Sequence, residues 1–145
     1  GSTNVIPDQV KLMGTFRALS EECRRQSHID MKSIVSDVEK KYNVRIELDI
    51  RHGYPALYND EEFTKKQISS AKEYLGKENV IDLPIRMTAE DFSYFANAVP
   101  SCFYRLGTGN KKKGIVHGLH TSRFDVDESS LKIGMGMLAY LAISS

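Results

Sequence analysis

The sequence predicts an α/β fold, in which a strand–helix–strand unit is followed by a part rich in helices. Residues 8–17 and 44–51 alternate apolar and polar side chains, which is typical of half-buried strands. Between these two segments, apolar residues recur at helical spacing. After Gly53-Tyr54-Pro55 the strand pattern stops and helical spacing dominates. We therefore divide the chain into residues 1–53 and residues 54–145.

The strand–helix–strand unit is defined by three apolar faces. Its first strand presents Val10, Leu12, Gly14 and Phe16, its second presents Val44, Ile46, Leu48 and Ile50, and its helix presents Met31, Ile34, Val35, Val38 and Tyr42. We expect the helix to begin near Ser20, although Ser27 and Asp30 also resemble a capping pair. Two strands and one helix are marginal alone. The unit therefore needs another chain or a larger protein to complete its sheet.

Capping residues set the limits of two helices in the second part. Asp60 is a good N-cap and Gly76 a good stop, so a helix is expected between them. Thr88 and Asp91 form a capping pair for another helix, which Pro100 ends. Each of these helices carries one apolar stripe.

The remaining segments of the second part are shorter or more apolar. Residues 80–83 and 102–106 are short strand candidates, and Lys111–Lys113 is expected to be a solvated loop. Residues 131–143 are apolar nearly all round, which predicts a buried terminal helix.

Composition excludes several classes of protein. Of 145 residues, 41% are hydrophobic and 27% charged, so the chain is an ordinary globular sequence. Its net charge of +1 offers no basic footprint for nucleic acid. The apolar run Ile133–Ile143 is too short to span a bilayer, and the first residues show no secretion signal. Cys23 and Cys102 have no metal-binding spacing and fit a reducing compartment, so we expect the cytoplasm.

Two histidines are the first candidates for chemistry. His117 and His120 form an H-x-x-H pair in a loop that contains glycine. Catalytic zinc takes three protein ligands and structural zinc four, and no cysteine or further histidine lies nearby in the sequence. The pair alone is therefore a weak metal signal, and an ordinary loop is the alternative.

Other polar residues also leave two interpretations open. The acidic pair at 90–91 fits helix-dipole capping better than paired-carboxylate catalysis, since neighbouring helical positions diverge. Arg17 ends a predicted strand, where it is either solvated or holds a carboxylate through its guanidinium fork. Gly107-Thr108-Gly109 is a short glycine turn without a phosphate-loop or dinucleotide fingerprint.

Four segments in order resemble one known family. They are Asn4–Asp8, Gly14–Arg17, Met87–Phe92 and Leu119–Asp125. Together they are similar to the zinc amidohydrolase and exopeptidase family that includes carboxypeptidase G, aminoacylase, hippurate hydrolase and the indole-acetyl-amino-acid hydrolases. The resemblance covers essentially the whole chain.

The resemblance implies part of a two-domain metallohydrolase. In that family an α/β catalytic domain is interrupted by a smaller lid, an antiparallel sheet with two helices that commonly mediates dimerisation. Residues 1–53 would then be the second half of the lid, and residues 54–145 the helix-rich C-terminal part of the catalytic domain. We accordingly expect a fragment of a longer enzyme that forms a homodimer through its lid.

The resemblance also implies roles for individual residues. His120 falls on the last metal-ligating histidine of the family, whereas His117 falls where the family varies. Asn4 and Arg17 fall on the lid residues that hold the substrate's carboxylate end, and Gly107 lies at the rim of the active site. The acidic pair at 90–91 is expected to support the site without ligating metal.

The implied chemistry is metal-assisted hydrolysis of N-acyl amino acids or small peptides. Two divalent ions, zinc in the first place with manganese or cobalt as alternatives, would activate water and polarise the amide carbonyl. The base and most ligands fall outside this chain, so no catalytic residue is assigned here. The alternatives are a non-catalytic dimerisation or ligand-binding module and a degenerate homologue that binds without turnover.

Overall fold

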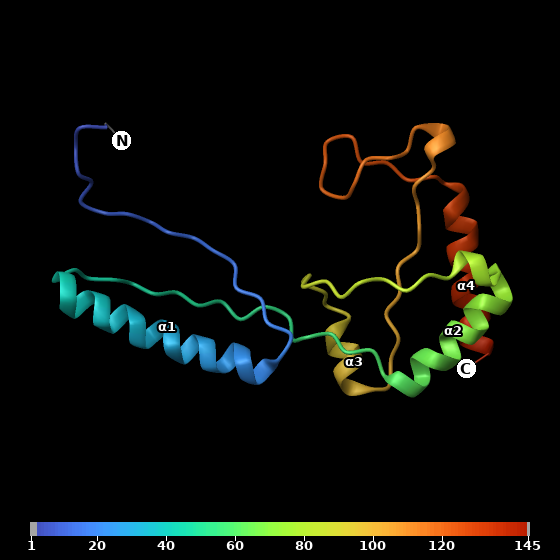
Figure 1. Ribbon diagram of the computed structural model, residues 1–145, viewed down its shortest axis with the longest axis horizontal. Helices are drawn as coiled ribbons and strands as arrows, with labels where there is room; N and C mark the ends of the chain where they lie inside the picture. The colour runs from blue at the N-terminus through green and yellow to red at the C-terminus, as the bar shows by residue number, and fades with distance from the viewer. Residues whose placement is uncertain (1–2, 145) are drawn as a thin grey trace. The chain divides into compact units, whose positions relative to one another are not determined.

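The computed structural model describes residues 3–144, which form two compact units (Figure 1). Unit 1 is the chain up to Ala56 with Met87–Ala89, and unit 2 is Leu57–Arg86 with the chain from Glu90 onward. Unit 1 holds one helix, and unit 2 holds three helices and two short 3-10 turns. The helices are α1 Glu21–Tyr42, α2 Glu61–Leu75, α3 Ser93–Ala98 and α4 Ser129–Ile143, and the 3-10 turns are η1 Lys77–Asn79 and η2 Lys111–Lys113.

The predicted α/β class is wrong for this structure, because residues 3–144 contain no strand and no sheet. The segments 8–17 and 44–51 are extended but pair with no neighbour, and 80–83 and 102–106 behave in the same way. One isolated bridge joins Asn110 to Ile115 in the described part. Alternation fixes which side chains share a face, whereas a strand also needs a partner backbone for its hydrogen bonds. The antiparallel lid sheet therefore does not form.

Helix α1 begins where the sequence predicts. The Ser20 side chain accepts a hydrogen bond from the Cys23 amide at 3.3 Å, and Asn43 ends the helix in the left-handed conformation, with φ at 51°. The alternative capping pair is wrong, since Ser27 lies inside the helix. There its hydroxyl donates to the Cys23 carbonyl, while Asp30 accepts from Gln26.

The chain after α1 returns along the helix (Figure 1). Its contacts with α1 involve helix side chains rather than a second backbone edge, so they hold the segment extended without making a strand. They are the Ile46 amide to Glu39 at 2.7 Å, the perpendicular rings of His28 and His52 at 4.7 Å, the Arg24 guanidinium to the Tyr54 carbonyl at 2.9 Å, and the Ala56 amide to Glu21 at 2.9 Å.

Unit 2 is organised by the packing of α2 against α4. The Asp60 side chain caps α2 by accepting from the Phe63 amide at 2.8 Å, and Gly76 ends it with φ at 90°, so both predicted limits are confirmed. The buried apolar core consists of Ala71 from α2 with Met137 and Leu141 from α4. The core therefore lies along one side of each helix.

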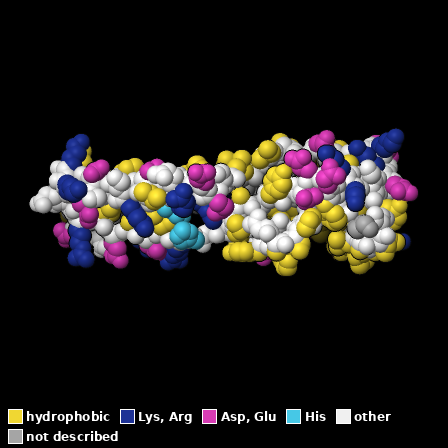
Figure 2. All heavy atoms as spheres, turned by 90° about the horizontal axis from the view of Figure 1, so that it is seen from below, with side chains coloured by type: hydrophobic (Ala, Val, Ile, Leu, Met, Phe, Trp, Pro, Cys, Tyr) yellow, Lys and Arg dark blue, Asp and Glu magenta, His cyan; other side chains and the backbone are white. Residues whose placement is uncertain are grey.

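The terminal helix is less buried than its sequence predicts. Leu131 and Met135 keep 57% and 68% of their surface exposed, and Figure 2 shows broad apolar patches on unit 2. An all-round apolar helix needs neighbours on every side, and within unit 2 α2 is the one helix packed against it. The expectation of a buried helix is therefore wrong for α4.

Helix α3 starts later than its predicted capping pair. It begins at Ser93, its N-cap position Phe92 makes no side-chain cap, and Thr88 and Asp91 do not act as a capping pair. Instead the Glu90 carboxylate accepts from the Phe92 amide at 3.3 Å, and the Ser93 hydroxyl donates to the Glu90 carbonyl at 2.6 Å. Glu90 thus shapes the turn that leads into the helix.

One glycine of α4 permits the close approach of α2. A Cβ atom on Gly136 would lie 2.0 Å from the hydroxyl oxygen of Tyr74. The Tyr74 ring is itself stacked on Tyr140, with 5.3 Å between ring centroids. A side chain at Gly136 would therefore have to displace a ring that already has a partner.

A single buried carboxylate connects the segment around η2 to the start of α4. Asp127, which is 6% exposed, accepts from the Lys113 ammonium at 2.6 Å, the Asn110 amide at 2.5 Å and the Ser129 backbone amide at 3.2 Å. Its own backbone amide donates to the Thr108 carbonyl at 2.8 Å. Asp127 therefore binds the first backbone amide of α4 and links it to residues 108–113.

We predict that Gly136→Ala destabilises the chain despite the better helix propensity of alanine. Alanine gains about 1 kcal/mol in a helix interior. The clash with Tyr74 costs about 1–3 kcal/mol as overpacking, with the stacked pair disturbed in addition. The midpoint of urea unfolding should fall, and it should recover in part in Gly136→Ala combined with Tyr74→Phe, which removes the nearest atom but keeps the ring carbon 3.0 Å from the added Cβ. Equal effects of Gly136→Ala in both backgrounds would contradict this packing.

We predict that the Asp127 contacts weaken in acid. Hydrogen bonds from Lys113 and then Asn110 hold the pKa of Asp127 well below its ordinary value near 3.8. A carboxyl whose pKa is lowered by folding stabilises the fold above its unfolded pKa, and this contribution is lost as the pH falls below about 4. Asp127→Asn should therefore be less stable than the wild type at pH 7, and the difference should shrink between pH 4 and pH 2. Parallel stability curves for the two proteins would refute the prediction.

Candidate functional site

The loop that carries both candidate histidines spans residues 116–126 and is held at its two ends. At its start, Ile115 pairs with Asn110 through two backbone hydrogen bonds of 2.8 and 2.9 Å. At its end, Asp127 accepts from the Asn110 side chain. One residue therefore joins both ends of the loop.

His120 lies in a turn of this loop in the left-handed conformation. Its φ is 63°, which is uncommon for a residue other than glycine. Its side chain is exposed, and that of His117 is half-buried. Hydrogen bonds within the loop run from the Thr121 hydroxyl to the Gly118 carbonyl at 2.9 Å and from the Phe124 amide to the Thr121 carbonyl at 3.2 Å. The backbone on both sides of His120 is thus fixed locally.

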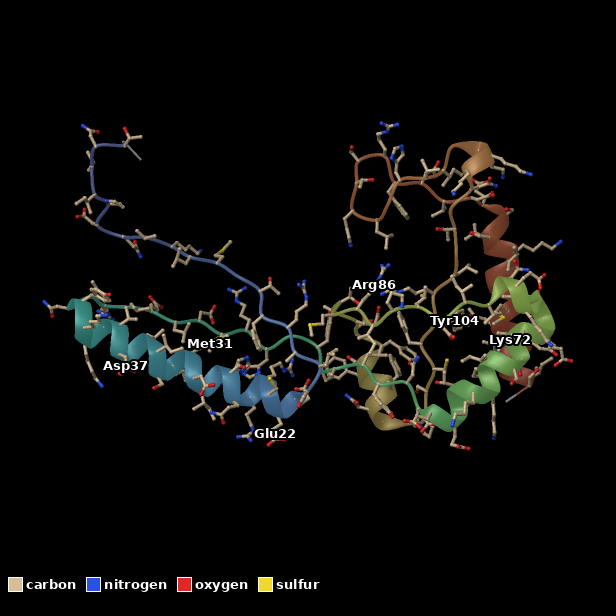
Figure 3. All side chains as sticks on the ribbon, viewed as in Figure 1. Glu22, Met31, Asp37, Lys72, Arg86 and Tyr104 are labelled. Carbon is tan, nitrogen blue, oxygen red and sulfur yellow. The ribbon has the colours of Figure 1, made fainter. Side chains whose placement is uncertain are left out.

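Gly107 belongs to the same part of unit 2. Figure 3 places Tyr104 on the extended segment that leads to it, and burial raises the pKa of the Tyr104 hydroxyl. Gly107 is exposed, and the next residue, Thr108, accepts from the backbone amide of Asp127. The structure therefore brings the predicted rim glycine to the residue that ends the His120 loop.

The two predicted carboxylate-binding residues belong to unit 1. Asn4 and Arg17 are both exposed and extend from segments outside α1. Neither makes a hydrogen bond or an ion pair with another residue in the range 3–144. Both side chains are therefore exposed, and they belong to a different unit from His120.

The donor set of the described residues fits a contribution to a metal site and not a complete one. No group of three or more His, Cys, Asp and Glu side chains among residues 3–144 could hold a metal ion. Catalytic zinc needs three protein ligands, and His120 is one exposed imidazole. The described residues therefore do not form a complete catalytic zinc site by themselves, and His120 is an exposed side chain of a type that can ligate metal.

Three residues of the loop's support were not found from the sequence. Lys113 was expected in a solvated loop, but its ammonium pairs with Asp127, although the side chain remains 58% exposed. Asn110 was given no role, and Asp127 was noted only as part of the resemblance, where it follows the Leu119–Asp125 segment. Aspartate just before a helix is a capping signal that could have identified Asp127, whereas its contact with Asn110 joins residues far apart in the chain.

Comparison with known proteins places the whole described chain in one family. A family model described as Peptidase family M20/M25/M40 matches residues 3–144. No helix in the described part is both long and apolar enough to cross a membrane. No solved structure matches the chain.

The curated relatives are hydrolases by name and are much longer. A thermostable carboxypeptidase 2 of Saccharolobus solfataricus is 37% identical over 144 residues, which are 97% of this chain and 35% of the relative. A probable hydrolase of Synechocystis is 34% identical over 140 residues, 96% of this chain and 36% of the relative. An IAA-amino acid hydrolase of Arabidopsis thaliana is 28% identical over 146 residues, 98% of this chain and 33% of the relative.

This chain spans about a third of the length of these relatives. The match nevertheless covers nearly all of the described residues, and it confirms the resemblance that the motifs indicate. The chain belongs to peptidase family M20/M25/M40.

Proposed function

We propose that this chain is part of a metal-dependent hydrolase that cleaves the amide bond of N-acyl amino acids or small peptides. The observation that carries the proposal is His120, a metal-ligand side chain exposed on a loop whose two ends are held by one residue. Membership of a peptidase family, with relatives named carboxypeptidase and amino acid hydrolase, supports the reaction class.

The described residues suit separate tasks in such a reaction. A divalent metal, bound in part by the His120 imidazole, would supply Lewis acidity and an activated water. Arg17 offers a planar guanidinium that can bind a carboxylate through two parallel hydrogen bonds, and Asn4 adds an amide donor. The backbone amide of Gly107 can donate to a substrate oxygen at the rim. The general base and the remaining ligands belong to the part of the protein outside this chain.

The same proposal includes the metal, the oligomeric state and the cellular compartment of the enzyme. We take the metal to be zinc, two ions per complete site, with manganese or cobalt as alternatives. A homodimer through unit 1 is supported by apolar side chains on its surface, among them Leu12, which is 90% exposed. We place the enzyme in the cytoplasm, acting on small substrates and not on nucleic acid or membranes.

The direct test compares the chain with the full-length protein. Hydrolysis of several N-acetyl amino acids and dipeptides is measured with added zinc, manganese or cobalt. We expect turnover by the full-length protein and none by the 145-residue chain, because one histidine cannot form a catalytic zinc site. Robust turnover by the chain alone would overturn the assignment of its missing ligands. A full-length protein that binds these compounds without cleaving them would support a binding module instead.

The metal content of two variants distinguishes the roles proposed for His120 and His117. In the full-length protein, His120→Ala should lose most of its zinc and most of its activity, because one of three protein ligands is removed. His117→Ala, three residues away in the same loop, is the matched control and should keep both. Elemental analysis after dialysis gives the result. Loss of metal from the His117 variant with retention by the His120 variant would show that the ligand assignment is wrong.

A further inference from the structure

We propose that Asn110 is a positioning residue for His120, because it joins the two ends of the loop on which that histidine lies. The inference rests on the proposed function, in which His120 holds a metal ion. The contacts of Asn110 with Ile115 and Asp127 are referred to below as the Asn110 clamp.

All polar groups of Asn110 are used in the clamp or beside it. Its backbone amide and carbonyl pair with the carbonyl and amide of Ile115. Its side-chain amide nitrogen donates to Asp127, and its side-chain oxygen accepts from the amides of Lys112 and Lys113 at 3.0 and 3.3 Å. Each polar atom of the residue therefore has at least one partner, so its position is determined from several directions.

The side-chain contact between Asn110 and Asp127 is shielded from water. Asp127 is 6% exposed, and Asn110 is half-buried. A hydrogen bond to an ionised acceptor is stronger than one between neutral groups, and limited access of water strengthens it further. The end of the loop is therefore held firmly, and the same carboxylate is attached to the first turn of α4 through Ser129.

The clamp matters because the backbone at His120 has an uncommon conformation. A non-glycine residue with φ at 63° persists where the surroundings hold it there. Hydrogen bonds inside the loop hold the turn itself, so freeing one end of the loop would let the turn shift as a unit and would move the imidazole from its position. The clamp thus acts on the histidine through the loop and touches neither metal nor substrate.

Asparagine is well suited to this position. An aspartate there would set a second carboxylate against Asp127, and an alanine would keep the backbone pair with Ile115 but lose the side-chain link to Asp127. Asn110→Ala therefore removes one support from the end of the loop, where Asp127 still binds Lys113 and Thr108, and leaves the start of the loop paired. It is the variant that isolates the proposed role.

The chain also provides a matched control. Asn59 is half-buried in unit 2, as Asn110 is, and its side chain joins both backbone groups of Phe103 at 2.9 and 2.8 Å. Asn59→Ala removes an amide with comparable bonds from a place outside the His120 loop. Any general loss of stability should be similar in the two variants.

The experiment measures zinc affinity of the full-length protein by competition with a chelator, together with thermal stability of the metal-free form. Asn110→Ala should weaken zinc binding about tenfold, as loss of an outer support of a metal ligand does, while Asn59→Ala should leave zinc affinity unchanged. Asp127→Asn, which keeps the shape of the side chain, should weaken zinc binding in the same direction. The absorption spectrum of the cobalt-loaded protein should change in Asn110→Ala and not in Asn59→Ala.

Each outcome separates this inference from the proposed function. If His120→Ala keeps its zinc, the proposed function fails. If His120→Ala loses zinc but Asn110→Ala and Asp127→Asn bind it as tightly as the wild type, the positioning role alone is refuted. Equal losses of affinity in the Asn110 and Asn59 variants would also refute it, since they would reflect general destabilisation.

Discussion

The neutralisation of one buried carboxylate is the constraint on which the arrangement of unit 2 depends. Asp127 is almost fully shielded from water, and an ionised group in such a place must find charge and hydrogen-bond donors within the protein. The structure satisfies it with Lys113, Asn110 and the start of α4. Because these donors come from two separate segments, η2 with its N-cap and the start of α4, satisfying the charge also links those segments.

The consequences continue along α4. With its first turn held at Asp127, the helix presents Met137 and Leu141 to Ala71 of α2. Gly136, next to this contact, leaves room for the Tyr74 ring. The small core and the polar cluster are therefore joined by one helix, with the cluster at its start and the core along its later turns.

Local signals in the sequence predicted the ends of the two longer capped helices, although the capping pairs at Ser27 and Thr88 failed. Ser20, Asp60 and Gly76 act at helix ends within a few residues of themselves, and all three are found as expected. The predicted strands failed for the opposite reason, because alternation along 8–17 and 44–51 carries no information about a partner. The candidate site shows the same difference between local and long-range signals. His120 was identified through a resemblance carried by neighbouring residues, whereas the contact between Asn110 and Asp127 spans a long loop and leaves no local pattern.

The candidate residues belong to two units, and each unit positions its own residues. Arg17 and Asn4 are in unit 1, whereas Gly107 and His120 are in unit 2. His120 is positioned by contacts within its own unit, because Asn110 contacts both ends of its loop. In the proposed metal site, an imidazole held in this way would lose little conformational freedom on binding the ion.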